Sequence, residues 1–160
     1  MKTQILFRIR LLLCLFMAGL IAAGLTTFFI PQEMAFLQTL FGEGKPFSNL
    51  FPPLTEWLSH ITPGILDMAE KYPYIYYGMD WLGFAHIVMA ILFIGPFRDP
   101  IKNIWVIEFG IIACILVIPA VLIFSPFRGI PFFWQLIDCS FGVFGIIPLW
   151  WVRKAILSLG

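Results

Sequence analysis

Long stretches without Lys, Arg, Asp or Glu constrain this chain more than any other feature of its sequence. Leu11 to Pro31 carries no charged side chain, and three later stretches carry a single one each. A helix needs about 20 residues to cross the ~30 Å hydrocarbon layer of a bilayer. We therefore predict four membrane-spanning helices, at about residues 11–30, 78–97, 103–125 and 133–152.

The composition of the chain excludes the main alternatives to a membrane protein. Of its 160 residues 61% are hydrophobic and only 12% are charged, whereas soluble domains are about 25% charged. A nucleic-acid-binding module needs a basic excess, and the net charge here is +1. We expect an all-α integral membrane four-helix bundle, folded as a single transmembrane domain over residues 1–160, that binds no nucleic acid.

The basic residues predict which way the chain crosses the membrane. Lys and Arg beside the spans favour the cytoplasm. Seven of the ten flank the predicted spans on one side: Lys2, Arg8, Arg10, Arg98, Lys102, Arg153 and Lys154. We therefore expect a multi-pass protein of the cell (inner) membrane with both termini in the cytoplasm.

The connection between the first two spans, residues 31–77, is apolar enough to form helices of its own. Pro31 suits the first turn of a helix, where its missing N–H costs nothing, and Gly42 can end that helix. Apolar residues spaced three and four apart predict two further short helices, from Pro53 to Ile61 and from Pro63 to Lys71. Amphipathic helices of this kind lie in the membrane interface, so we expect them to cap the bundle on its outer side, as an anchor or as a lid over a pocket.

Ionisable residues within the spans are the candidates for function, because placing a charge in a bilayer is costly. With ~1.5 Å of rise per residue, His86 lies roughly 12 Å and Asp138 roughly 6 Å below the outer surface, and Asp80 lies near that surface. His86 and Asp138 each share a helix face with small residues, and such faces pack on other helices. We therefore expect both side chains to point inward and to form a pair. Glu108 lies near the inner surface, where we expect a structural ion pair with Arg98 or Lys102.

A His–Asp pair has the parts for general acid–base catalysis, because the carboxylate orients the imidazole. The same pair can also act as a hydrogen bond between helices. We therefore treat His86, Asp138 and Asp80 as catalytic candidates, and His86, Asp138, Trp134 and Trp81 as ligand-binding candidates. Two histidines and three scattered cysteines match no metal-ligand spacing, and no nucleotide-binding motif occurs, so we expect no metal and no cofactor.

These residues leave two main interpretations of function open, beside a third, a transporter built as an oligomer, that the uncharged first span and the lack of a repeat disfavour. The first is a small membrane protein that binds a lipid-like or quinone-like molecule, or a partner subunit. The alternative is a membrane-embedded enzyme that uses the His–Asp pair on an apolar substrate. A four-span chain with an apolar first loop loosely resembles several families of small membrane proteins, including those associated with quinol oxidases. That resemblance lies in architecture alone and assigns no residue.

Overall fold

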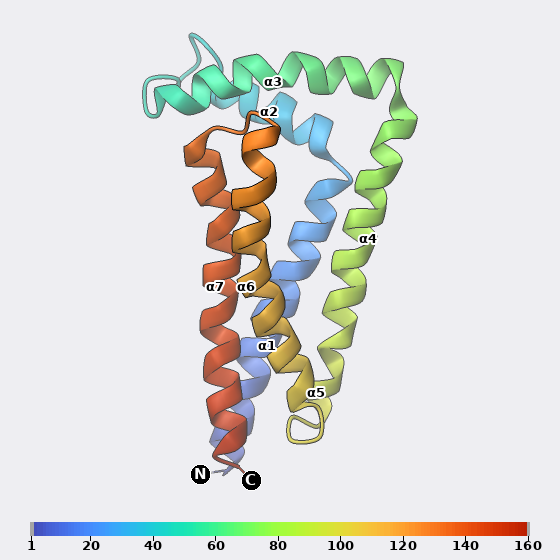
Figure 1. The fold of residues 1–160 in the computed structure, drawn as a ribbon, viewed down its shortest axis with the longest axis vertical. Helices are drawn as coiled ribbons and strands as arrows, with labels where there is room; N and C mark the ends of the chain where they lie inside the picture. Colours follow the sequence, from blue (N-terminus) through green and yellow to red (C-terminus); the bar gives the residue numbers. More distant parts are fainter. Residues whose placement is uncertain (1, 160) are drawn as a thin grey trace. The chain divides into compact units, whose positions relative to one another are not determined.

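The computed structural model describes residues 2–159 of the chain, and every element formed by these residues is helical (Figure 1). In chain order the elements are α1 (Lys2–Thr27), α2 (Ile30–Phe41), α3 (Pro52–Lys71), the 3-10 helix η1 (Pro73–Tyr76), α4 (Tyr77–Leu92), α5 (Ile94–Arg98), α6 (Ile104–Phe127) and α7 (Phe132–Leu157). The predicted all-α class is thereby confirmed.

Within residues 2–159, four helical segments are long and apolar enough to cross a membrane: Lys2–Thr27, Pro73–Arg98, Ile104–Phe127 and Phe132–Leu157. They coincide with the four predicted spans and indicate an integral membrane protein. The first span ends three residues earlier than predicted, because a new helix starts at Ile30 with Pro31 in its first turn. The second is interrupted at Phe93, since Pro96 has no N–H to donate to the carbonyl one turn before it.

The helices pack into two compact units, unit 1 (Met1–Leu20 with Val88–Gly160) and unit 2 (Ile21–Ile87). α1 and α4 each contribute residues to both units. The expectation of a single domain stays a prediction.

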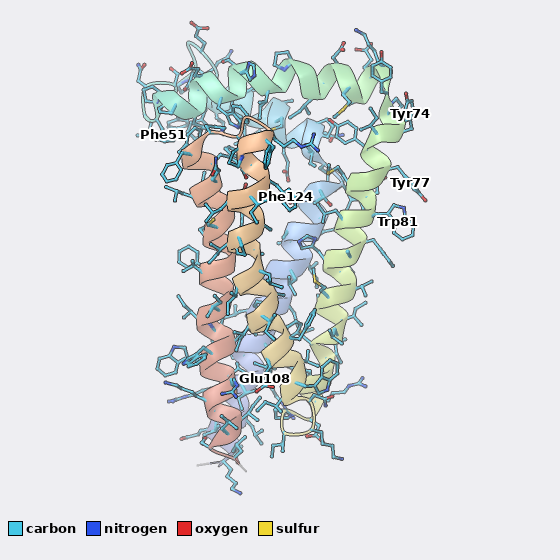
Figure 2. All side chains as sticks on the ribbon, viewed as in Figure 1. Phe51, Tyr74, Tyr77, Trp81, Glu108 and Phe124 are labelled. Atoms are coloured by element: carbon cyan, nitrogen blue, oxygen red, sulfur yellow. The ribbon has the colours of Figure 1, made fainter. Side chains whose placement is uncertain are left out.

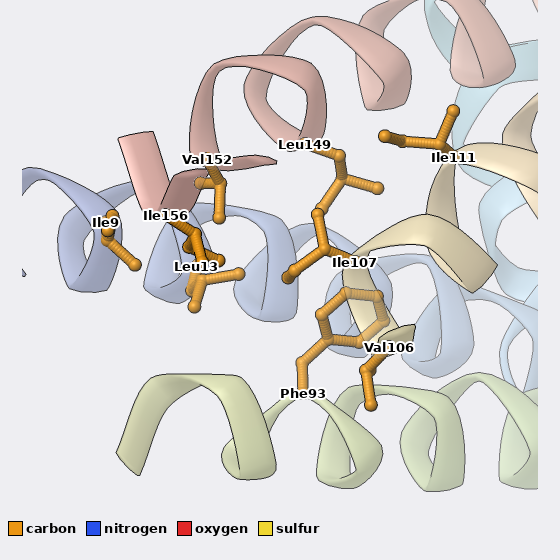
Figure 3. Packing of buried hydrophobic residues seen from close by; sticks show 9 residues of the cluster. All are labelled: Ile9, Leu13, Phe93, Val106, Ile107, Ile111, Leu149, Val152 and Ile156. Carbon is orange, nitrogen blue, oxygen red and sulfur yellow. The ribbon is translucent and has the colours of Figure 1, made fainter. Parts of the chain in front are cut away.

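In unit 1, α1, the end of α4, α6 and α7 surround one apolar core (Figure 3). α6 and α7 lie side by side as a hairpin, and Gly129 in the connecting turn has a φ of 67°, which glycine adopts at little cost. The buried core side chains come from α1, α6, α7 and the link between α4 and α5: Ile9, Leu13, Phe93, Val106, Ile107, Ile111, Leu149, Val152 and Ile156. Their burial gives unit 1 an apolar core of its own.

In unit 2, α2 and α3 pack on each other, and α3 runs across the direction of α4 (Figure 1). The Tyr76 hydroxyl donates to the Ile65 carbonyl at 3.0 Å and holds the corner between α3 and α4. The predicted helix that starts at Pro31 and ends at Gly42 is confirmed.

One expectation about unit 2 is wrong, because α3 continues through Pro63 as a single helix instead of two short ones. Leu58 and Thr62 lie one helical turn apart on the same face of α3, and both are buried. Pro63 itself is exposed, so its ring points away from this packed face. Burial of one continuous face therefore outweighs the local cost of a proline inside a helix, which is ~3 kcal/mol.

Candidate functional site

An open, shallow hollow in unit 2 is the best candidate for a binding site. It has a volume of about 340 Å³ and is lined by Phe28, Tyr77, Asp80, Trp81 and Phe84. The last four are spaced three and four apart on α4, so they share one face of that helix. Figure 2 shows Tyr77 and Trp81 projecting from the same side of α4.

The aromatic rings of the hollow support one another. The Trp81 ring meets the Tyr77 ring edge-on at 6.0 Å and the Phe84 ring edge-on at 5.6 Å. Edge-to-face pairs at such separations are favourable because the ring edge is positive and the ring face negative. The three side chains nevertheless stay more than half exposed, so a ligand can reach them.

A close crossing of α1 and α4 brings Phe28 to this hollow. A Cβ atom added to Gly24 would lie 2.8 Å from the Gly83 carbonyl oxygen, and one added to Gly83 would lie 2.7 Å from the Gly24 carbonyl oxygen. Only glycine at both positions permits this approach. The chain turns directly after the crossing, with the Phe28 N–H donating to the Leu25 carbonyl at 3.2 Å. The Phe28 ring then lies against Gly83.

The hollow brings together two of the residues that the sequence singled out, Asp80 and Trp81. Asp80 is exposed, and no basic side chain among residues 2–159 forms an ion pair with it. Sequence reasoning missed Phe28, Tyr77 and Phe84 as lining residues. For Tyr77 and Phe84 the helical spacing to Asp80 and Trp81 was an available signal, whereas nothing local marks Phe28.

His86 belongs to the same unit but does not line the hollow. Its Nδ1 atom lies 2.8 Å from the Leu82 carbonyl oxygen. A carbonyl only accepts hydrogen bonds, so Nδ1 carries the hydrogen and Nε2 remains available. The His86 Cβ atom would be 3.0 Å from a Cβ added to Gly24. Gly83 and His86 thus lie against α1 at Gly24, whereas Asp80, which the sequence places on the same face, is exposed.

Asp138 and Trp134 lie on α7 in unit 1, and both are half-buried. The Trp134 ring meets the Phe133 ring edge-on at 6.2 Å. One turn after Asp138, Gly142 lies against the backbone of Cys114 on α6. Because His86 and Asp138 belong to different units, their pairing and the enzyme based on it stay predictions.

The predicted ion pair of Glu108 forms with a different partner. Arg153 on α7 donates to Glu108 through both Nε and Nη2, each at 2.9 Å (Glu108 is labelled in Figure 2). Lys102 instead lies 3.7 Å from Asp99. The expected pairing with Arg98 or Lys102 is wrong, because the antiparallel contact of α6 and α7 places Arg153 opposite Glu108 across the helix interface.

Four buried polar side-chain atoms on α2 and α3 were not anticipated from the sequence. They have no hydrogen-bond partner among the described residues: Gln38 Oε1, Trp57 Nε1, Ser59 Oγ and Thr62 Oγ1. Burying such groups without partners costs free energy. They are therefore available to ordered water or to a polar group that enters unit 2.

Nothing in the part of the chain from residue 2 to 159 gathers three His, Cys, Asp or Glu side chains that could hold a metal ion. No family model, no characterised protein and no solved structure matches this chain.

Proposed function

We propose that this membrane protein binds a lipid-like or quinone-like amphiphile at the aromatic hollow of unit 2. The observation that carries the proposal is the lining of the hollow, which consists of four aromatic side chains and a single carboxylate. Small-molecule sites are mostly apolar, with a few polar groups that orient the ligand. The volume of about 340 Å³ suits the head of an amphiphile and the first part of its chain.

The position of the hollow supports an amphiphilic ligand over a fully polar one. Tyr77 and Trp81 open the second span at the predicted outer interface, where aromatic side chains have one end in apolar and one in wet surroundings. A ligand in this place can lay its chain along apolar residues of α4 in the bilayer. Its polar head then meets Asp80.

Binding can be tested with purified protein in micelles of a non-ionic maltoside detergent. Two probes, dodecanol and a quinone with a decyl chain, are titrated by calorimetry, and we expect saturable binding of one molecule per chain for at least one of them. Trp81→Leu should weaken it. Trp151→Leu is the matched control, because Trp151 is an exposed tryptophan of unit 1. Uptake of amphiphiles that never saturates, or a Trp151→Leu variant that weakens binding as much as Trp81→Leu, refutes the proposal.

We further propose that both termini are cytoplasmic in the cell (inner) membrane. The support is the distribution of Lys and Arg beside the four candidate spans: seven of them flank one set of span ends, against three (Lys45, Lys71 and Arg128) at the other. Basic residues remain preferentially on the cytoplasmic side.

This orientation predicts which introduced cysteines a membrane-impermeant maleimide reaches in intact cells. In a background with the three native cysteines replaced by alanine, Lys45→Cys should react and Ser158→Cys should react only after the cells are opened. The reverse pattern refutes the orientation.

A further inference from the structure

The hollow of unit 2 has the chemical composition of a site for an organic cation. Ammonium groups are attracted to the negative faces of aromatic rings, most strongly to tryptophan. Here one tryptophan, one tyrosine and two phenylalanines line an open hollow together with a carboxylate. The carboxylate is Asp80, and it forms no ion pair with the Lys and Arg side chains of residues 2–159.

The rings are also accessible in the way that cation binding needs. Tyr77 is 63% exposed, Trp81 55% and Phe84 53%. Their mutual contacts are edge-on, so each contact occupies at most one ring face. A cation within about 6 Å of a ring centre gains this interaction.

The charge of the surrounding unit favours a cation as well. Unit 2 contains six Asp and Glu and only two Lys, and one of these, Lys71, is already paired with Asp67 at 2.6 Å. No basic side chain lines the hollow. An anionic head would therefore meet Asp80 without a compensating charge, whereas a cationic head would neutralise it.

We propose that the hollow binds the ammonium headgroup of an amphiphile that lies in the bilayer, with Asp80 as counter-ion and Trp81 as the main aromatic contact. This assignment rests on the proposed function and narrows it from amphiphiles in general to those with an ammonium group. The alkyl chain is part of the ligand, because the hollow is open and the residues of α4 beyond it are apolar apart from His86.

The test compares three probes by titration calorimetry in non-ionic micelles: dodecyltrimethylammonium, dodecanol of the same chain length, and tetramethylammonium, which has the head without the chain. We expect the folded protein to bind dodecyltrimethylammonium about tenfold or more tightly than dodecanol, since several rings and one carboxylate contribute. Tetramethylammonium should bind more weakly than dodecyltrimethylammonium. If tetramethylammonium instead bound as tightly as the chain-bearing probe, the hollow would be a site for free cations, and the assignment to an amphiphile would be overturned.

Two variants and two matched controls locate the effect. Asp80→Asn removes the charge and keeps the shape, and Trp81→Leu keeps an apolar side chain without a ring. Each variant should lower the affinity for dodecyltrimethylammonium by about two- to fivefold and change the affinity for dodecanol less. Glu70→Gln removes an acid of the same unit that lies outside the hollow, and Trp151→Leu removes an exposed tryptophan of the other unit. Neither control should change the affinity, and circular dichroism confirms that each variant is folded.

Failure of this inference differs from failure of the proposed function. Equal saturable binding of the ammonium and alcohol probes, weakened by Trp81→Leu but not by Asp80→Asn, overturns the ammonium assignment and leaves amphiphile binding intact. An equal loss in Glu70→Gln and Asp80→Asn also overturns it, because the attraction would then come from the unit as a whole. No saturable binding of any probe refutes both.

Discussion

The crossing of α1 and α4 offers the sharpest test of how this fold is held together. In Gly83→Ala the added methyl group would lie 2.7 Å from the Gly24 carbonyl oxygen and 2.8 Å from Cζ of Phe28, and closer still to Oγ1 of Thr27. The Thr27 hydroxyl cannot simply turn away, because it donates to the Gly24 carbonyl at 2.7 Å. The two helices must therefore separate.

The size of the effect follows from that separation. An increase of ~0.5–1 Å in the distance between packed atoms of the two helices forfeits a quarter to a half of the dispersion energy between them. Overpacking of this kind costs about 1–3 kcal/mol. For a chain of this length the loss lowers the melting temperature by about 2–10 °C. Displacement of Phe28 should also weaken the binding of any ligand in the hollow.

The assay is thermal unfolding in detergent, followed by intrinsic tryptophan fluorescence. The matched control is Gly78→Ala on the same helix, where an added Cβ meets no atom within 4 Å. There the loss of backbone freedom in the unfolded chain should leave stability unchanged or slightly raised. Equal melting temperatures for Gly83→Ala and Gly78→Ala would refute the close crossing.

Three further predictions concern other contacts. Glu108→Gln and Arg153→Gln should each lower the free energy of unfolding by ~1 kcal/mol in thermal unfolding, since the pair is only half-buried. The double variant that exchanges the two charges, Glu108→Arg with Arg153→Glu, should recover most of the lost stability. A double variant less stable than either single variant contradicts the pair. Gly145→Ala places a methyl group 2.6 Å from Sγ of Cys114 and should lower the free energy of unfolding by about 1–3 kcal/mol. In a double-mutant cycle, adding Cys114→Ala should recover part of that loss. Strictly additive effects of the two substitutions would speak against this contact. Pro63→Ala should raise the melting temperature, because a proline inside a helix costs ~3 kcal/mol; a lower value would show that the ring itself is needed.

Part of the candidate site could be predicted from the sequence. Asp80 and Trp81 stand out because a charge and a tryptophan mark the predicted outer end of a span, and both line the hollow. Phe28 could not be found in this way, because it reaches the hollow only through a turn after α1 and a crossing of two glycines. The pairing of His86 with Asp138 stays a prediction, since it depends on how two helices distant in the chain are arranged.

The all-α class and the four spans follow from the amino-acid sequence, because the length and charge of a segment are local properties that decide whether it suits a bilayer. Contacts between helices are needed to explain why α3 passes through Pro63, why Glu108 pairs with Arg153, and why Phe28 joins the hollow. Each of these depends on which helix faces are neighbours, and packing between such faces can outweigh local preferences. The charge-poor stretches thus locate the helices, while close contacts between the helices assemble the candidate site.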